Sequence, residues 1–151
     1  MTIDIRAAEP GDIAFILQSI QEVNQKSGLN QEPYLNETIL KEDLFSKDPA
    51  AFVAIAFKDN RHAGFALYAP MYFTTLGRSL WITQLFTHAD YRKQGIATNL
   101  LVYLKNKYPQ YNALCWAATD DNQEAKKVFN KITPSKLDDV TFYILRNTHD
   151  N

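Results

Sequence analysis

Residues 91–98, which run YRKQGIAT, combine two basic side chains with glycine and alanine in a short segment. Gly95 can adopt a positive φ and leaves room for a ligand to approach the backbone. A helix that begins here has N–H groups without intrahelical acceptors and a partial positive charge at its start. A diphosphate would satisfy those groups, with Arg92 and Lys93 as nearby cations and the Thr98 hydroxyl as a further donor. The pattern predicts a diphosphate-binding loop, and an ordinary basic loop capped by glycine is the alternative.

Two phosphate-binding patterns of other protein classes are missing from the sequence. It has no G-x-x-x-x-G-K-[ST] run and no G-x-G-x-x-G run opening a first βαβ unit, which argues against a nucleotide hydrolase or a dehydrogenase. His62, His88 and His149 are scattered and lack the spacing of a metal site. His88 lies close to the loop, but an exposed loop histidine is the simpler interpretation. We therefore expect no metal.

The elements before the loop follow from hydrophobic periodicity. Ile3 and Ile5 predict a short strand, and an apolar stripe after Pro10 predicts a helix that ends near residues 27–28. Asn36 is suited to cap a second helix, which residues 47–49 should stop. A β-hairpin is then predicted from residues 51–57 and 63–68, joined by the polar residues 58–61, with a third antiparallel strand at 79–87.

The elements after the loop alternate between helix and strand. Apolar residues at helical spacing predict a helix from the loop to about Lys107, and Pro109 should close it. A short strand at residues 112–117, a helix at 122–131 and a final strand at 140–146 complete the order. This order predicts an α/β fold in which helices flank both faces of a mixed, mostly antiparallel central sheet.

Length, charge and cysteine content narrow the functional classes. With 151 residues, of which 46% are hydrophobic, the chain is expected to form a single domain over residues 1–151. A formal net charge of -1 and the lack of a basic stripe argue against nucleic-acid partners. No apolar run approaches the roughly 20 residues that a membrane span needs. Residues 1–6 lack a basic segment followed by an apolar stretch, so we expect a soluble, unprocessed protein. Cys115 is the sole cysteine, which fits a reducing compartment and predicts a cytoplasmic location.

Together the strand, the loop and the following helix resemble the GNAT superfamily of acetyltransferases, whose conserved segment contains [QR]-x-x-G-x-[GA]. The element order is also similar, from about Ile3 to Leu145. Residues 64–68 (GFALY) and 76–81 (LGRSLW) look like the diamine (spermidine/spermine) and thialysine acetyltransferase branch. The resemblance implies acetyl-CoA as cosubstrate and N-acetylation of a primary amine by direct attack in a ternary complex. The acceptor would be a polyamine, a thialysine-like compound or another small amine.

The resemblance also implies which residues bind the cofactor. A splayed strand would present backbone groups to the pantetheine arm, the loop would hold the pyrophosphate, and a second signature, N-x-x-A-x-x-[FV]-[YF], would line the cofactor from its Asn and Ala positions. The implied set is Leu85, Phe86, Thr87, Arg92, Lys93, Gln94, Gly95, Ile96, Ala97, Thr98, Asn122 and Ala125. Asn122 is equally suited to cap a helix, and the side chains of Leu85 and Phe86 are suited to core packing.

The catalytic groups that the resemblance implies are replaced in this sequence. Many relatives protonate the departing thiolate with a Tyr where this chain has Phe129, and the polyamine branch usually has a Glu-Asp pair where it has Thr83 and Gln84. Phe cannot donate a proton, and neither Thr nor Gln can act as a base. A backbone N–H near Phe86 would serve the oxyanion. The catalytic residues therefore stay unassigned.

Two interpretations remain open. Transfer could persist through positioning, oxyanion stabilisation and water-relayed proton transfer, because orientation alone can supply about 7–11 kcal/mol of barrier reduction. Alternatively, the fold binds acyl-CoA with weak or no catalysis and serves as a sensor or interaction module. Substitute proton carriers are Tyr68, Tyr72, Tyr143 and Cys115, although aromatic strand residues and a lone cysteine usually serve packing.

The acceptor side is less defined. Residues 31–43 carry four carboxylates, Glu32, Glu37, Glu42 and Asp43, which would attract a protonated amine or simply form a solvated helix face. Residues 70–77 would form an apolar wall for the acceptor or merely a long hairpin connection. The identity of the amine, the acyl-chain preference and the oligomeric state are not determined, and a homodimer is kept open.

Overall fold

A five-stranded sheet forms the centre of the computed structural model, which describes residues 2–26, 34–117, 126–127, 129 and 143–147. The strands lie in chain order from β1 to β5; the first four pair antiparallel, and β4 and β5 pair parallel. Their bounds are Ile3–Ala7 (β1), Phe52–Lys58 (β2), Arg61–Phe73 (β3), Gly77–Thr87 (β4) and Ala113–Trp116 (β5). The predicted α/β class with a mixed, mostly antiparallel sheet is confirmed.

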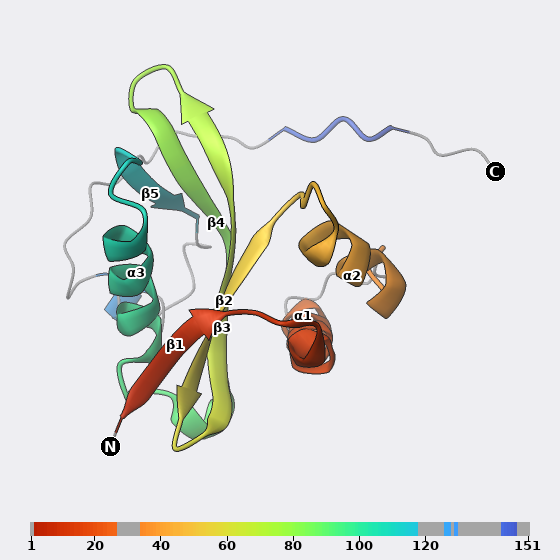
Figure 1. Cartoon of the computed structure of the whole chain (residues 1–151), viewed down its shortest axis with the longest axis vertical. Helices are drawn as coiled ribbons and strands as arrows, with labels where there is room; N and C mark the ends of the chain where they lie inside the picture. The colour runs from red at the N-terminus through yellow and green to blue at the C-terminus, as the bar shows by residue number, and fades with distance from the viewer. Residues whose placement is uncertain (1, 27–33, 118–125, 128, 130–142, 148–151) are drawn as a thin grey trace.

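Helices cover both faces of this sheet (Figure 1). The helices are α1 (Ile13–Lys26), α2 (Glu37–Phe45) and α3 (Ile96–Lys107), with short 3₁₀ turns at Pro10–Asp12 (η1) and Ala89–Tyr91 (η2). α3 packs on one face through Ile96, Leu100, Leu101 and Leu104. α1 and α2 pack on the other face, around the fully buried Ile16, Ile55 and Phe65. Each face therefore has its own apolar core.

Local signals placed the element boundaries well. The side chain of Asn36 accepts a hydrogen bond of 2.8 Å from the Ile39 N–H, as expected of an N-cap. Asp59 and Asn60 both have positive φ, 50° and 66°, so they alone form a tight two-residue turn. Lys58 and Arg61, which were predicted to belong to the connection, pair with each other at the ends of β2 and β3.

The β3–β4 hairpin is longer than predicted. β3 continues through Pro70 to Phe73, and β4 begins at Gly77, so residues 70–77 are mostly strand and not a long connection. Figure 1 shows this arm (green) extending past the rest of the sheet. Because β2 begins at Phe52, opposite Tyr68, no described residue pairs with the β2 side of the arm beyond that point. A proline is tolerated along such an edge.

The late elements are described only in part. Lys126, Lys127 and Phe129 are helical, in agreement with the predicted helix at residues 122–131. The predicted strand at 140–146 is wrong for residues 143–146, which are exposed and belong to no strand. Their β-branched and aromatic residues favour a strand locally, but a strand forms only when it pairs with a neighbouring strand, and residues 143–146 pair with none of the strands of the described sheet.

A buried carboxylate joins the start of the chain to the β2–β3 hairpin. Asp12 is 4% exposed and accepts hydrogen bonds from Arg6 Nη1 (2.7 Å) and His62 Nε2 (2.8 Å). The Glu9 N–H donates to it as well, at 2.8 Å. Burial alone would raise the pKa of Asp12, but the hydrogen bonds from Arg6 and His62 lower it to about 2. The charged form of Asp12 is thus an integral part of the fold.

Replacing Asp12 with asparagine is expected to lower the free energy of unfolding at pH 7 by about 2 kcal/mol. The folded-state pKa lies below the unfolded value near 3.8, so this stabilisation is complete above about pH 4 and is lost as the pH falls toward 2. Urea unfolding of both proteins between pH 7 and pH 2 measures the difference. It should shrink on acidification, and a difference that stays constant would contradict the assignment. Asp4→Asn, an exposed carboxylate on β1, is the matched control.

Candidate functional site

The site begins where β4 and β5 separate. β5 pairs with β4 only from Ser79 to Ile82, opposite Ala113 to Trp116. Beyond Ile82, β4 continues to Thr87 along β3 alone, within the part of the chain that the structure describes. The outer edge of β4 over residues 83–87 is therefore left open beside β5. The predicted cofactor-binding residues Leu85, Phe86 and Thr87 all lie on this stretch.

A β-bulge marks the point of separation. Leu67 of β3 pairs with Gln84, and Tyr68 pairs with Ile82, so Thr83 is an extra residue without a partner on β3. Thr83 is exposed, and its hydroxyl donates to the Leu67 carbonyl at 3.4 Å. Bulges of this kind bend a strand and often lie beside active sites. The two positions that depart from the polyamine branch, Thr83 and Gln84, thus lie at this bend.

The backbone of β4 turns two of the three predicted residues toward the open edge. The His88 N–H donates to the Ala63 carbonyl of β3 at 2.8 Å. Backbone groups alternate in direction along a strand, so Phe86 faces β3 as His88 does, while Leu85 and Thr87 face away. Side chains alternate as well, with Phe86 in the core below α1 and Leu85 against the α3 face. An oxyanion donor on this strand would therefore be the N–H of Leu85 or Thr87.

The basic loop leads from the end of β4 into α3. Lys93 and Gly95 both have left-handed backbone, with φ of 62° and 85°. Gly95 is the N-cap of α3 and has no side chain to satisfy the first N–H groups of the helix. The first hydrogen bond of the helix runs from Asn99 N to Gly95 O, at 2.9 Å. The preceding N–H groups therefore lack intrahelical acceptors, which is the geometry that an anion satisfies.

Side chains around the loop divide into buried and exposed sets. Ile96 is fully buried against the α3 face, which fixes the start of the helix to the sheet. Arg92, Lys93 and Gln94 are exposed, while Ala97 and Thr98 are partly exposed. The loop thus joins a helix start that is anchored in the core to basic side chains that are exposed at the surface.

Lys58 lies near the basic loop but belongs to neither of the two cofactor-binding motifs of the sequence. It ends β2, is only 7% exposed, and its ammonium donates to the side-chain oxygen of Gln94. The sequence contains a signal for this position. Lys58 is two residues after Ala56 and four after Ala54, so it lies on the same side of β2, the side that faces α3. A lysine at such a position is unusual in a strand, because charged side chains are rarely buried without a partner.

Phe129 lies beside the point of separation. Its ring is 5.2 Å from that of Trp116, measured between centroids, and Trp116 pairs with Ile82, immediately before the bulge. The position at which many relatives carry a proton-donating Tyr therefore lies next to the bend in β4. Asn122 and Ala125, the other residues of the second signature, lie outside the described residues.

The four substitute proton carriers are divided: the backbone of Tyr68 pairs with Ile82 at the bulge and that of Cys115 with the neighbouring Trp81, whereas Tyr72 and Tyr143 lie away from the bend. Tyr72 is on the exposed β3–β4 arm, and Tyr143 is 87% exposed outside the sheet. Tyr68 is buried and shares a 2.7 Å hydrogen bond with the Tyr108 hydroxyl. Burial and this contact raise the pKa of Tyr68. Burial likewise raises the pKa of Cys115, whose side chain contacts Ser79. Raised pKa values make Tyr68 and Cys115 weaker acids than usual.

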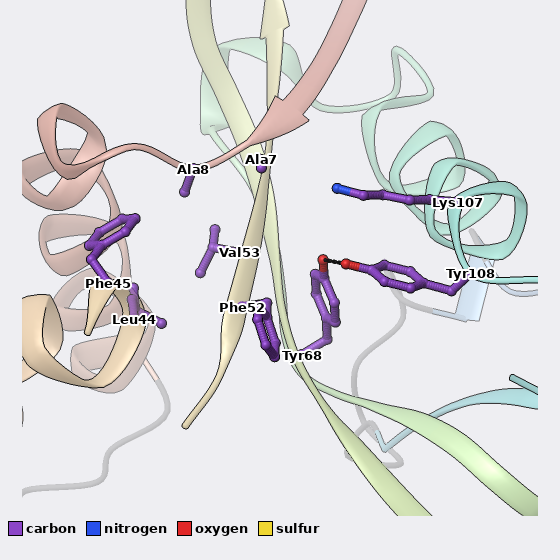
Figure 2. Close-up of a pocket in the computed structure, with 9 residues that line it drawn as sticks. All are labelled: Ala7, Ala8, Leu44, Phe45, Phe52, Val53, Tyr68, Lys107 and Tyr108. Carbon is purple, nitrogen blue, oxygen red and sulfur yellow. Dashed lines mark hydrogen bonds between the residues drawn. The ribbon is translucent and has the colours of Figure 1, made fainter. Parts of the chain in front are cut away.

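Two cavities lined by described residues contain no carboxylate in their lining. Glu37 and Glu42 of α2 are exposed, as in a solvated helix face, and Glu32 lies outside the described residues. One of the two cavities, of about 140 Å³, lies between α2 and the C-terminal end of α3. Figure 2 shows its lining residues, with the Tyr68 and Tyr108 hydroxyls meeting on the α3 side. Its lining contains Lys107 and no carboxylate. It is therefore poorly suited to a protonated amine.

The described residues show neither a candidate metal site nor a candidate membrane span. They contain no group of three or more His, Cys, Asp or Glu side chains that could hold a metal ion. Nor do they include a helix with the length and apolar character that crossing a membrane requires. His88 makes a local contact, its Nδ1 accepting from the Asp90 N–H at 3.1 Å.

Comparison with known proteins agrees with this arrangement. The model of the Acetyltransferase (GNAT) family matches residues 17–133. Thialysine N-epsilon-acetyltransferase from Sus scrofa is 27% identical over 105 residues, which cover 64% of this chain and 62% of that protein. The match therefore spans less than two thirds of this curated relative.

Solved structures share the same architecture. An aminoglycoside acetyltransferase from an uncultured soil metagenomic sample, solved with sisomicin, has a TM-score of 0.76 at 15% identity, covering 96% of this chain and 97% of that one. A predicted acetyltransferase from Clostridium acetobutylicum, solved with acetyl-CoA, has a TM-score of 0.69 at 23% identity, covering 95% and 96%. At these identities the likeness concerns the fold.

Proposed function

Because this chain belongs to the Acetyltransferase (GNAT) family, we propose that it transfers an acetyl group from acetyl-CoA to the primary amine of a small molecule. The acceptor class is a polyamine, a thialysine-like compound or another small amine. Transfer takes place by direct attack in a ternary complex, within a single domain over residues 1–151. The thialysine acetyltransferase relative supports this class of acceptor.

One observation carries the proposal: the open edge of β4 leads directly into the uncapped start of α3. Leu85 and Thr87 offer backbone groups along that edge, and Gly95 leaves the first N–H groups of α3 accessible. A pantetheine arm is an extended chain with amide groups and pairs well with a strand edge. A diphosphate fits a helix start. Acetyl-CoA contains both groups, a pantetheine arm followed by a diphosphate. They follow each other in the same order as the edge of β4 and the start of α3 along the chain.

The reaction depends little on side chains that donate or accept protons. The amine nitrogen attacks the thioester carbon, a C–N bond forms, the C–S bond breaks, the nitrogen loses a proton and the thiolate gains one. The N–H of Leu85 or Thr87 is placed to stabilise the oxyanion. Neither Thr83 nor Phe129 exchanges protons at neutral pH, so water must carry them. The loss of a positioned acid or base lowers the rate by about 10²- to 10⁴-fold without abolishing it.

The same observation favours a second candidate. Thr83 and Gln84 lie at the bend beside the open edge, Phe129 packs against Trp116 of β5, and none of the three provides a base or an acid. An acyl-CoA-binding module with weak or no catalysis would have this combination of a retained cofactor groove and replaced proton carriers. Binding and turnover must therefore be measured separately.

Acetyl-CoA at 100 times its Kd is expected to stabilise the protein by roughly 2.7 kcal/mol, seen as a rise in Tm of several degrees. Thermal unfolding with and without acetyl-CoA measures this shift. S-acetylpantetheine, which lacks the diphosphate and the nucleotide, is the control and should shift Tm less at equal concentration. The absence of any shift with acetyl-CoA would remove the basis of both candidate functions.

Turnover separates the two candidates. Release of free thiol from acetyl-CoA is followed with spermidine, thialysine, lysine, an aminoglycoside and a peptide N-terminus as acceptors. We expect release above the hydrolysis background with at least one of the small amines. Tight binding of acetyl-CoA with no release for any amine would establish the binding module instead.

A further inference from the structure

Lys58 lies beneath the basic loop, on the face of the sheet that α3 covers. It is 7% exposed, although it carries a charge, and its ammonium donates to the side-chain oxygen of Gln94. Gln94 immediately precedes Gly95, the N-cap of α3. The contact therefore links the end of β2 to the turn that exposes the first N–H groups of the helix.

Several positive charges lie close together around this contact. Within the described residues no carboxylate pairs with Lys58, and its partner is a neutral amide. The start of α3 carries a partial positive charge of its own, and Arg92 and Lys93 add two further cations within the same loop. An ammonium that is nearly buried is unfavourable without an anion nearby. An anion bound at the loop would compensate this positive charge.

Lys58 also restrains the loop conformation. The other end of the Gln94 amide donates to the Asp90 carbonyl at 3.3 Å, so this side chain is held at both ends. The backbone on either side of it is left-handed, at Lys93 and Gly95. A left-handed lysine costs about 1–2 kcal/mol and persists only where its surroundings hold it. The link from Lys58 through Gln94 to Asp90 provides such a restraint.

We propose that Lys58 is a positioning residue for the diphosphate of acetyl-CoA. It holds Gln94 so that the N–H groups at the start of α3 keep the geometry of an anion site. It also places a positive charge below that site, where solvent screens it less than it screens the exposed Arg92 and Lys93. This inference rests on the proposed function and specifies how its donor is recognised.

The test compares two acetyl donors with Lys58→Met, which keeps the length of the side chain and removes its charge. For acetyl-CoA, the Kd is expected to rise about 10-fold, the size of one lost charge-assisted contact. For S-acetylpantetheine, kcat/KM should stay within about twofold of the unmodified protein, because this donor has no diphosphate for the loop to bind. Lys58→Arg should restore most of the affinity for acetyl-CoA. Lys105→Met, an exposed lysine near the other end of α3, is the matched control.

A change in salt dependence provides a second readout. The slope of log Kd for acetyl-CoA against log salt concentration should be shallower in Lys58→Met, because one cation fewer acts on the phosphates. A merely structural role would leave this slope unchanged. An equal loss with both donors, an unchanged slope, or an unchanged Kd would each overturn the inference.

Gln94→Ala keeps the inference testable if Lys58→Met does not fold, which circular dichroism would reveal. This variant removes the link at the exposed end and should also raise the Kd for acetyl-CoA without affecting S-acetylpantetheine. Affinity equal to that of the unmodified protein would exclude the positioning role. Failure of the unmodified protein to bind acetyl-CoA would contradict the proposed function, and the inference with it. Normal binding with no effect of either variant would contradict the inference alone.

Discussion

Replacing Phe129 with tyrosine is expected to raise kcat for acetyl transfer by about 10²-fold, the lower end of what a positioned general acid contributes. The substitution adds a hydroxyl to a ring that already lies 5.2 Å from Trp116, beside the separation of β4 and β5. A phenol there can protonate the departing thiolate, as the resemblance to tyrosine-bearing relatives implies. Initial rates of thiol release at saturating acetyl-CoA and amine measure the effect.

The expected gain depends on an otherwise intact site. The Kd for acetyl-CoA should change little, because the substitution alters neither the basic loop nor the edge of β4. Phe52→Tyr, which adds the same hydroxyl at the exposed start of β2, is the control and should leave kcat unchanged. If Phe129→Tyr gives no acceleration while acetyl-CoA still binds, proton supply is not what limits the reaction, and the binding-module interpretation gains support.

Gly64→Ala is expected to affect both stability and cofactor binding, lowering the free energy of unfolding by about 1–3 kcal/mol. A Cβ at this position would lie 2.3 Å from the Phe86 carbonyl oxygen and 2.9 Å from Cγ2 of Ile96. Gly64 is thus the place where β3 approaches both the open strand and the start of α3. The backbone oxygen cannot move aside without shifting β4, so acetyl-CoA affinity should fall together with stability.

Two measurements check this result. Urea unfolding gives the change in stability, and titration with acetyl-CoA gives the change in Kd. Gly11→Ala is the matched control, because no atom lies within 4 Å of a Cβ built at that position. A Gly64→Ala protein with unchanged stability and affinity would show that β3 and β4 tolerate a wider separation than the structure indicates.

The features that the sequence predicted correctly are those set by neighbouring residues. Asn36 caps α2 through a contact three residues away, and Asp59 and Asn60 form a turn because both tolerate a positive φ. Gly95 at the start of α3 likewise follows from a short pattern. The order of strands and helices up to β5 was predictable because hydrophobic periodicity reports which face of each element is buried.

The strand predicted at residues 140–146 shows where local reasoning fails. Residues 143–146 have the composition of a strand but pair with none of the described strands. The β3–β4 arm shows the opposite error, since Pro70 and its neighbours suggest a loop but pair with β4. Strand formation depends on a partner distant in sequence, which local propensity does not identify.

By itself the sequence determined the basic loop, the helix that follows it and the likeness to acetyltransferases, because these reside in contiguous residues. Only the tertiary structure decided that β5 leaves β4 after Ile82, that Thr83 is the extra residue of a bulge, and that Phe129 lies against Trp116. It also placed Lys58 below Gln94, which lies 36 positions later in the chain. Such contacts arise from the register of distant strands and the packing of α3 on the sheet, and no short stretch of sequence encodes either of them.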